Sequence, residues 1–400
     1  MKTILIINKL YCAMKKFIIL AASAALVLGA CSKNEIVTSG NLVPVTFGTY
    51  IGNVKATSET TYGDLTLSAL QGSSYGFGVF GYYADNASNG NTNDIASAAN
   101  PAKFTPNFMY NQKVTYSASK WSYSPLKYWP NEYSALNAKT DAGIDKLSFT
   151  AYAPHVATVG DDGITAFSAN TATGSPTIAF KVPADGAKQI DLLYAKNFAS
   201  TINLVKSTIP YAVSFEFAHA LSQLSFKVQA VVDEVTPSTG ALDAATTITL
   251  NSITLKAGSI NESGTLTLTD GSWSSTSASA SDHVYSDIDQ TVTTTLTAVE
   301  KGGSAISLYA VPGAIAAGNL QIEVVYTVVT TDAALPGGKV TMVNDIYNVS
   351  TAAFTFEANK KNVVNLLLGM TSLKMTVTSI DAWGDGDETT VNLPVNVAGA

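Results

Sequence analysis

The chain has 400 residues, of which 46% are hydrophobic and 13% charged, and its formal net charge is −7 at pH 7. All 23 basic residues are lysines, so the chain lacks the guanidinium group that reads guanine and phosphate, which argues against nucleic-acid binding. The acidic balance is typical of a secreted protein that stays soluble. Both cysteines, Cys12 and Cys31, lie near the N-terminus, which excludes a disulfide framework in the body of the protein.

The N-terminal region has the pattern of an export signal. Two lysines follow Met14, and the apolar run after them, residues 17–28, is too short to span a bilayer. Small residues precede Cys31, as they do where lipoprotein signals are cleaved. We therefore expect residues 1–30 to be a lipoprotein signal peptide that truly starts at Met14, with Cys31 lipidated and residues 31–40 serving as a tether. The alternatives are an ordinary secretory signal with an incidental cysteine, or a transmembrane helix.

The first and last strand-like segments of the mature chain share one pattern. Residues 41–51, NLVPVTFGTYI, and residues 391–397, VNLPVNV, alternate apolar and polar side chains, which predicts half-buried strands. Each segment has one proline among its apolar positions and must tolerate a missing backbone donor. We predict that both fit one groove; the alternative is that residues 391–397 are the last strand of their own domain. The apolar positions are Val43, Val45 and Phe47 in the first segment and Val391, Leu393, Val395 and Val397 in the last.

Between these segments the sequence predicts a succession of short strands. The clearest alternation runs from Leu320 to Val328, and a change of phase after Leu250 predicts a β-bulge near Asn251. No long window shows the spacing of an amphipathic helix. Strands at this spacing, with turn residues between them, predict an all-β fold of two β-sandwiches joined near residues 200–208.

A set of short motifs in a fixed order resembles the Bacteroidetes fimbrillin family, the subunits of type V pili. The motifs are WSYSPLKYWP at 121–130, DLLYAK at 191–196 and FAHALSQLSF at 217–226, after the cysteine-terminated signal and the first strand. The resemblance implies two transthyretin-like β-sandwich domains in tandem, at residues 41–203 and 204–400. It also implies a structural role in adhesion, with no catalytic residues and no cofactor.

The resemblance further implies how such a subunit matures. It would be exported as an outer-membrane lipoprotein through Cys31 and then cut between Lys55 and Ala56 by a trypsin-like protease, which releases the first strand. The donor strand of another fimbrillin subunit, about residues 390–397, would then fill the groove on the cell surface. The family commonly offers arginine at the cut and this chain has none, so either a lysine-accepting protease acts or Lys55 stays intact and the protein remains a lipid-anchored base subunit.

Other signals favour less specific interpretations. Residues 72–76 match G-x-S-x-G, but a strand pattern follows where a hydrolase needs a helix. The three histidines have no metal-ligand spacing, so we predict no metal site, and we expect His219 to hydrogen-bond within a turn between strands. The aromatic residues of segment 121–130 are a candidate glycan platform, although aromatic residues usually pack in cores. A second hypothesis is therefore a monomeric surface lipoprotein of this fold that binds a glycan or host protein, or a tip or anchor subunit.

Overall fold

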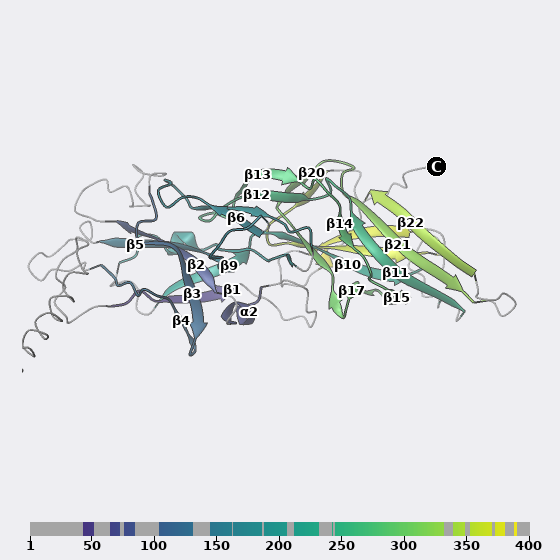
Figure 1. Cartoon of the computed structure of the whole chain (residues 1–400), viewed down its shortest axis with the longest axis horizontal. Helices are drawn as coiled ribbons and strands as arrows, with labels where there is room; N and C mark the ends of the chain where they lie inside the picture. Colours follow the sequence, from purple (N-terminus) through teal and green to yellow (C-terminus); the bar gives the residue numbers. More distant parts are fainter. Residues whose placement is uncertain are drawn as a thin grey trace, which may run out of the picture. The chain divides into compact units, whose positions relative to one another are not determined.

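In the part of the chain that the computed structural model describes, nearly all of the regular secondary structure is β-strand (Figure 1). Within the described part, the helical elements are the five-residue α2 (Leu67–Gln71) and the short 3₁₀ turn η3 (Phe198–Ser200). The all-β prediction is confirmed. The described residues are 43–51, 65–72, 76–84, 104–130, 145–161, 163–185, 188–205, 212–231, 242, 245–331, 339–348, 353–369, 373–380 and 388–389.

The first sheet has seven strands in the order β1-β9-β8-β5-β2-β3-β4. Its neighbouring strands are antiparallel except for β1 and β9, which are parallel and lie together in Figure 1. The first strand of the described residues, β1, therefore lies at an edge of this sheet. In sheet order the strands are β1 (Phe47–Ile51), β9 (Val213–His219), β8 (Leu193–Ala195), β5 (Lys146–Ala153), β2 (Phe77–Ala84), β3 (Met109–Ser117) and β4 (Lys120–Ser122).

Both faces of the seven-stranded sheet are covered, and this explains why β2 is buried along almost its whole length. Phe77 and Val79 pack into one hydrophobic cluster, together with the side chains of β1. Phe80 and Tyr82 point to the opposite face and pack with Phe180 of a second sheet. Strands buried on both faces have nearly continuous apolar runs instead of strict alternation, as the sequence GFGVFGYY has here.

The second sheet has four strands in the order β13-β12-β7-β6. Its central pair joins segments far apart in the sequence, because Gly264 of β12 lies opposite Phe180 of β7. The strands are β13 (Trp273–Ala278), β12 (Asn261–Thr267), β7 (Thr177–Lys181) and β6 (Gly163–Phe167).

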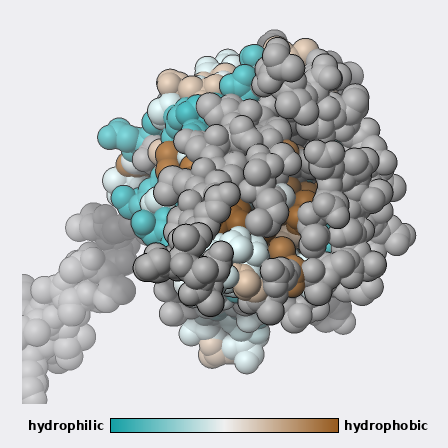
Figure 2. All heavy atoms as spheres, turned by 90° about the vertical axis from the view of Figure 1, so that its right-hand side faces the viewer, coloured by the Kyte–Doolittle hydropathy of each residue, from teal (hydrophilic) through white to brown (hydrophobic). Residues whose placement is uncertain are grey.

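Two further sheets enclose the largest hydrophobic cluster, which draws on Phe226, Leu250, Tyr326 and Leu366. In Figure 2 hydrophilic residues gather along one margin of the visible face, and apolar residues show toward its middle between grey atoms. The six-stranded sheet contains β16 (Thr297–Ala298), β10 (Ser222–Ala230), β24 (Lys361–Leu368), β25 (Leu373–Ile380) and β26 (Glu388–Thr389), with β19 (Ser307–Ala310) also paired to β10. The five-stranded sheet contains β14 (His283–Tyr285), β11 (Thr246–Leu255), β21 (Gln321–Thr330) and β22 (Lys339–Asn348), with β15 (Gln290–Val292) also paired to β11.

Two small pairs complete the strands: β17 (Glu300–Lys301) pairs with β18 (Ser304–Ala305), and β20 (Gly313–Ile315) pairs with β23 (Phe354–Phe356).

Residues 44–400 form one compact unit. The predicted division into two sandwiches after residue 203 stays a prediction. Three strand pairings connect segments on either side of that residue: β9 pairs with β1 and with β8, and β12 pairs with β7. In the described residues, no helix has the length and apolar character needed to cross a membrane.

Two local predictions are confirmed. The pairing of β11 with β21 slips between Leu250 and Ser252, so a bulge lies at Asn251. Strand β21 alternates buried and half-buried residues from Gln321 to Val328, as its sequence pattern predicts. In both cases the period of apolar residues carries the structural information, because one face of each strand lies against the core.

His283 at the start of β14 is buried without a hydrogen bond to either ring nitrogen from any described residue. Its Nε2 atom lies 3.9 Å from Oε2 of Glu262. Burial lowers the pKa of His283, an effect that Lys181 adds to and that the carboxylates of Glu262 and Asp282 oppose. The folded protein therefore binds a proton here less readily than the unfolded chain does.

We expect this histidine to weaken the protein in mild acid. Its contribution to stability is fully present above the unfolded pKa of about 6.5, and it is lost as the pH falls toward the lower folded pKa. In urea titrations between pH 7 and 5, His283→Met should show a smaller loss of unfolding free energy than the parent chain. The neighbouring Val284→Ala is the control, because Val284 is 56% exposed; an unchanged slope in His283→Met would contradict the assignment.

Candidate functional site

The site lies where the first strand joins the seven-stranded sheet. Strand β1 runs parallel to β9, with Phe47 opposite Val213 and Ile51 opposite Phe217. Among the described strands, β9 is the one that pairs with β1 in a ladder. An edge strand of this kind can be exchanged for another strand without breaking the interior of the sheet.

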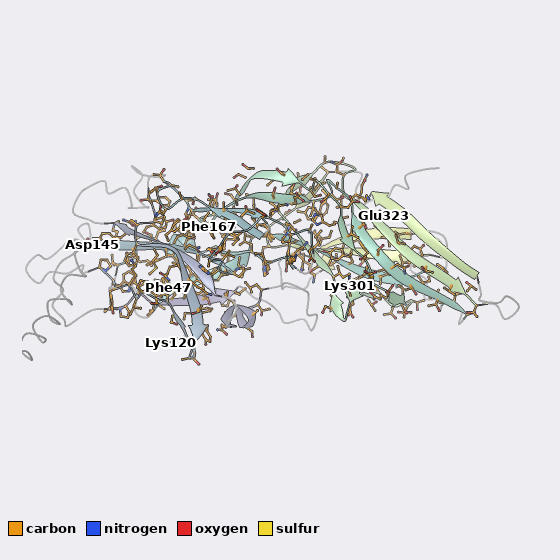
Figure 3. All side chains as sticks on the ribbon, in the orientation of Figure 1. Phe47, Lys120, Asp145, Phe167, Lys301 and Glu323 are labelled. Atoms are coloured by element: carbon orange, nitrogen blue, oxygen red, sulfur yellow. The ribbon has the colours of Figure 1, made fainter. Side chains whose placement is uncertain are left out.

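The apolar side chains of β1 and of the residues just before it fill one end of a core. Val45 is fully buried, Phe47 is 5% exposed and Ile51 is 6% exposed, whereas Val43 is 40% exposed. Val45 and Phe47 therefore face the core, as the alternation predicts. Val43 lies before the residues that the sheet holds and is exposed. Figure 3 labels Phe47 among the side chains of this sheet.

Phe47 is surrounded by aromatic rings. Its ring stacks on Phe215 of β9 at a centroid distance of 5.6 Å. It meets Phe149 edge-on at 5.5 Å and Phe77 edge-on at 6.4 Å, and Tyr123 lies tilted at 5.5 Å. These contacts make Phe47 a strong anchor of the first strand, because aromatic pairs add to the gain from burial alone.

The aromatic segment 121–130 grips the backbone of the first strand at Val45. The Val45 N–H donates to the Lys127 carbonyl oxygen at 2.9 Å, and the Tyr123 hydroxyl donates to the Val45 carbonyl oxygen at 2.9 Å. The Lys127 N–H donates to the same hydroxyl at 3.3 Å. Burial raises the pKa of Tyr123 to about 12, so this hydroxyl keeps its proton at neutral pH. We call Tyr123 and Lys127 the clasp.

Pro44 sits beside the clasp at a position that does not need a backbone donor. It lies opposite Tyr128 in an antiparallel bridge, and the hydrogen bond of that bridge comes from the N–H of the next residue, Val45. Pro44 therefore costs no hydrogen bond on the side that faces the clasp. A proline is tolerated here for the same reason that prolines occur at sheet edges.

The aromatic residues of the segment serve the first strand and its core. Trp129 is 8% exposed, and the ring of Trp121 meets Phe77 at 4.9 Å. Tyr128 is 39% exposed and is the outward-facing aromatic residue of the segment. The segment therefore does not offer the row of exposed rings that a glycan platform needs.

A buried pair of polar side chains, Asp191 and His219, holds the backbone at Leu65. The N–H of Leu65 donates to Oδ2 of Asp191 at 2.8 Å, and Nδ1 of His219 lies 2.7 Å from the same oxygen. The side chain of Asp191 is fully buried and that of His219 is 5% exposed. Thr66 then caps α2 by accepting from the N–H of Ala69 at 3.1 Å. Such a pair must be satisfied, because buried polar groups without partners are costly.

Sequence reasoning missed this anchor, since residues 191 and 219 are far apart in the chain. A signal was present, because each titratable residue stands inside one of the short motifs, DLLYAK and FAHALSQLSF. The sequence alone predicts that His219 bonds within a turn; the structure places it at the end of β9, against Asp191.

The described residues on either side of positions 52–64, Ile51 and Leu65, are both held near the same end of β9. Ile51 is opposite Phe217, and Leu65 is held through Asp191 by His219, two residues further along β9. The predicted cut between Lys55 and Ala56 falls between these two residues and lies outside the described residues. A cut there would leave the hydrogen bond from Leu65 to Asp191 on the opposite side of the break from β1.

The lipidation site Cys31 and the predicted donor strand, residues 390–397, lie outside the described residues. The residues just before that strand form β26, which pairs antiparallel to β25 with Thr389 opposite Ser379. The predicted donor segment therefore begins directly after a strand at the edge of the six-stranded sheet.

The structure offers no support for the hydrolase motif at residues 72–76. Helix α2 precedes it and β2 follows it, which is the reverse of the strand-to-helix order that a nucleophile elbow needs. The described residues also contain no group of three metal-ligating side chains.

Replacing Asp191 with alanine should destabilise the protein strongly. The Leu65 N–H would lose its acceptor inside the core, and His219 would lose its partner. We expect a loss of about 3 kcal/mol in the free energy of unfolding, measured by urea titration. Asp185→Ala is the control, because Asp185 is 54% exposed and its ion pair with Lys188 lies on the surface; an equal effect of both changes would contradict the anchor.

Replacing Tyr123 with phenylalanine should loosen the first strand. The change keeps the ring but removes the hydrogen bond to Val45, at a cost of about 1 kcal/mol. It should also reduce the alkaline loss of stability: the unfolded tyrosine ionises near pH 10 and the folded one near pH 12, so stability falls across this window. Urea titrations at pH 8, 10 and 11 would test both effects. Tyr128→Phe should leave stability nearly unchanged, and equal effects would argue against the clasp.

Comparisons with known proteins agree with this architecture. A family model described as fimbrillin-like matches residues 72–383. The fimbrium subunit Fim1C of Phocaeicola vulgatus is 28% identical over 404 residues, which cover 94% of this chain and 98% of that protein. The crystal structure of a fimbrial protein from Bacteroides vulgatus has the same fold, with a TM-score of 0.62 at 22% identity, and the match covers 86% of this chain and all of that one. The chain therefore belongs to the fimbrillin-like family of pilus structural subunits.

Proposed function

We propose that this pilus subunit polymerises by donor-strand exchange, in which the tail of one copy replaces the first strand of another. The observation that carries the proposal is the position of β1. It is a five-residue edge strand, paired in parallel with β9, and its segment fills a core with Val45, Phe47 and Ile51. Burial of each such side chain contributes about 1.5–3 kcal/mol, so a subunit without β1 would expose an apolar groove that favours refilling.

Maturation would open the groove. In this proposal the chain is exported as an outer-membrane lipoprotein through Cys31, and a protease that accepts lysine cuts between Lys55 and Ala56. The anchor at Leu65 supports this order of events, because its hydrogen bond to Asp191 involves no residue of β1. The partners would be other fimbrillin subunits, and the fibre would stand on the cell surface, where it supports adhesion.

The tail would supply the replacement strand. Residues 390–397 follow β26 at a sheet edge and repeat the apolar alternation of the first strand. The competing arrangement is a tail that remains the last strand of its own sheet, which would leave a monomeric, lipid-anchored surface protein that binds a glycan or host protein. Trp129 belongs to the hydrophobic cluster that contains Val45 and Phe47, and Trp121 packs against that cluster, so neither ring is free for a glycan, which favours the polymer.

The proposal predicts which changes abolish the polymer. The protein sheared from expressing cells should begin at Ala56 and form ladders in detergent that collapse on heating. Lys55→Gln should keep it lipid-anchored and monomeric, whereas Lys33→Gln in the tether should change nothing. Deleting residues 390–400 should give processed monomers. N-terminal sequencing and electrophoresis with and without heating measure both outcomes.

Two results would contradict parts of the proposal. Ladders from a chain that still begins at Cys31 would show that assembly does not need the cut. Ladders from the chain without residues 390–400 would show that the tail is not the donor.

A further inference from the structure

The hydrogen bonds of the clasp to the first strand involve only main-chain atoms of one residue, Val45. The clasp contacts the N–H and the carbonyl oxygen of Val45, and neither contact uses its side chain. On the opposite side, the N–H of Val213 donates to the Thr46 carbonyl oxygen at 2.8 Å. Any strand that replaced the first one would be held in the same way, provided its residue at position 45 carries a backbone N–H.

The hydrogen bonds to Val45 accept almost any residue at position 45, but the neighbouring positions restrict which residues can occupy them. Position 44 tolerates proline, because the hydrogen bond at that bridge comes from position 45. Position 47 lies in a pocket of four aromatic rings and requires an apolar side chain. Proline at position 45 would remove the backbone N–H that donates to the Lys127 carbonyl oxygen. The site therefore accepts a four-residue pattern at positions 44–47: a proline, any residue with a backbone N–H, one residue of any kind, and an apolar residue.

The tail of this chain contains that pattern once. Its sequence VNLPVNV has one proline, Pro394, followed by Val395, Asn396 and Val397. A shift of one residue forward would place the proline on the clasp, and a shift by one in either direction would turn the apolar side chains away from the core.

We propose that Tyr123 and Lys127 set the register of the incoming tail, so that Pro394 of one copy lies opposite Tyr128 of the next and Val397 enters the Phe47 pocket. This inference rests on the donor-strand assembly proposed above and adds the partner residues and the direction of the strand. The tail runs as β1 does, parallel to β9. Valine is smaller than the phenylalanine that it replaces, so the pocket is incompletely filled in the polymer.

A cysteine scan tests the register directly. In an antiparallel pair of this type the Cα atoms lie about 4.5–5.5 Å apart, which a disulfide can bridge at about 4.4–6.8 Å. Tyr128→Cys is combined in turn with a cysteine at each tail position from 391 to 397, and polymers from cells are oxidised and analysed after heating without reductant. We expect the covalent ladder to peak at Pro394→Cys.

Controls fix the meaning of each outcome. Pro44→Cys with Tyr128→Cys in the uncut Lys55→Gln chain should form the disulfide within one chain, and its absence would overturn the geometry of the bridge. A peak at Asn392, Asn396 or any other tail position would overturn the register while leaving strand exchange intact. If the parent chain, without any substitution, forms no heat-labile ladders, strand exchange itself is overturned, and the register with it.

The pocket gives an independent measurement. Val397→Phe should raise the temperature at which ladders dissociate, because the pocket already accommodates a phenylalanine in the first strand. Val391→Phe is the matched control, since the proposed register places it three residues before the proline and outside the gripped positions. A stabilising effect of Val391→Phe without one from Val397→Phe would overturn the assignment.

Discussion

The burial of Phe47 among aromatic rings is the contact on which the arrangement of this protein depends. The four surrounding rings come from β2, β5, β9 and the segment after β4, so one side chain of the first strand ties distant parts of the chain together. Each aromatic pair adds about 0.5–1.5 kcal/mol beyond the gain from burial. The same contact belongs to a strand at the edge of its sheet, which makes it both strong and replaceable.

Strand periodicity predicted much of the fold. The alternation from Leu320 to Val328 corresponds to β21, and the change of phase after Leu250 corresponds to a bulge in β11. These predictions work because a strand with one buried face carries its orientation in its own sequence. The buried positions Val45 and Phe47 were predicted on the same grounds. The motifs quoted for the fimbrillin resemblance also mark the site, since they contain Tyr123, Asp191 and His219.

What the sequence could not provide are contacts between segments far apart in the chain. Nothing local to residues 47–51 shows that their partner is β9, or that the two strands run parallel. The bond from Leu65 to Asp191 and the pairing of β7 with β12 have the same character. A hydroxyl that donates to a backbone carbonyl, as Tyr123 does, leaves no pattern in the sequence because its partner is present in every residue.

The two chain ends fixed at β9, Ile51 and Leu65, have a kinetic consequence. While the peptide chain between them is intact, the first strand is tethered to its own groove at an effective concentration on the order of millimolar. The proposed cut would leave the pairing of β1 with β9 in place, but it would turn rebinding of the first strand from an intramolecular event into a diffusive encounter. If the proposed cut is made, the subunit becomes a complex of two pieces, and the lifetime of that complex would limit how soon the groove could accept a new strand.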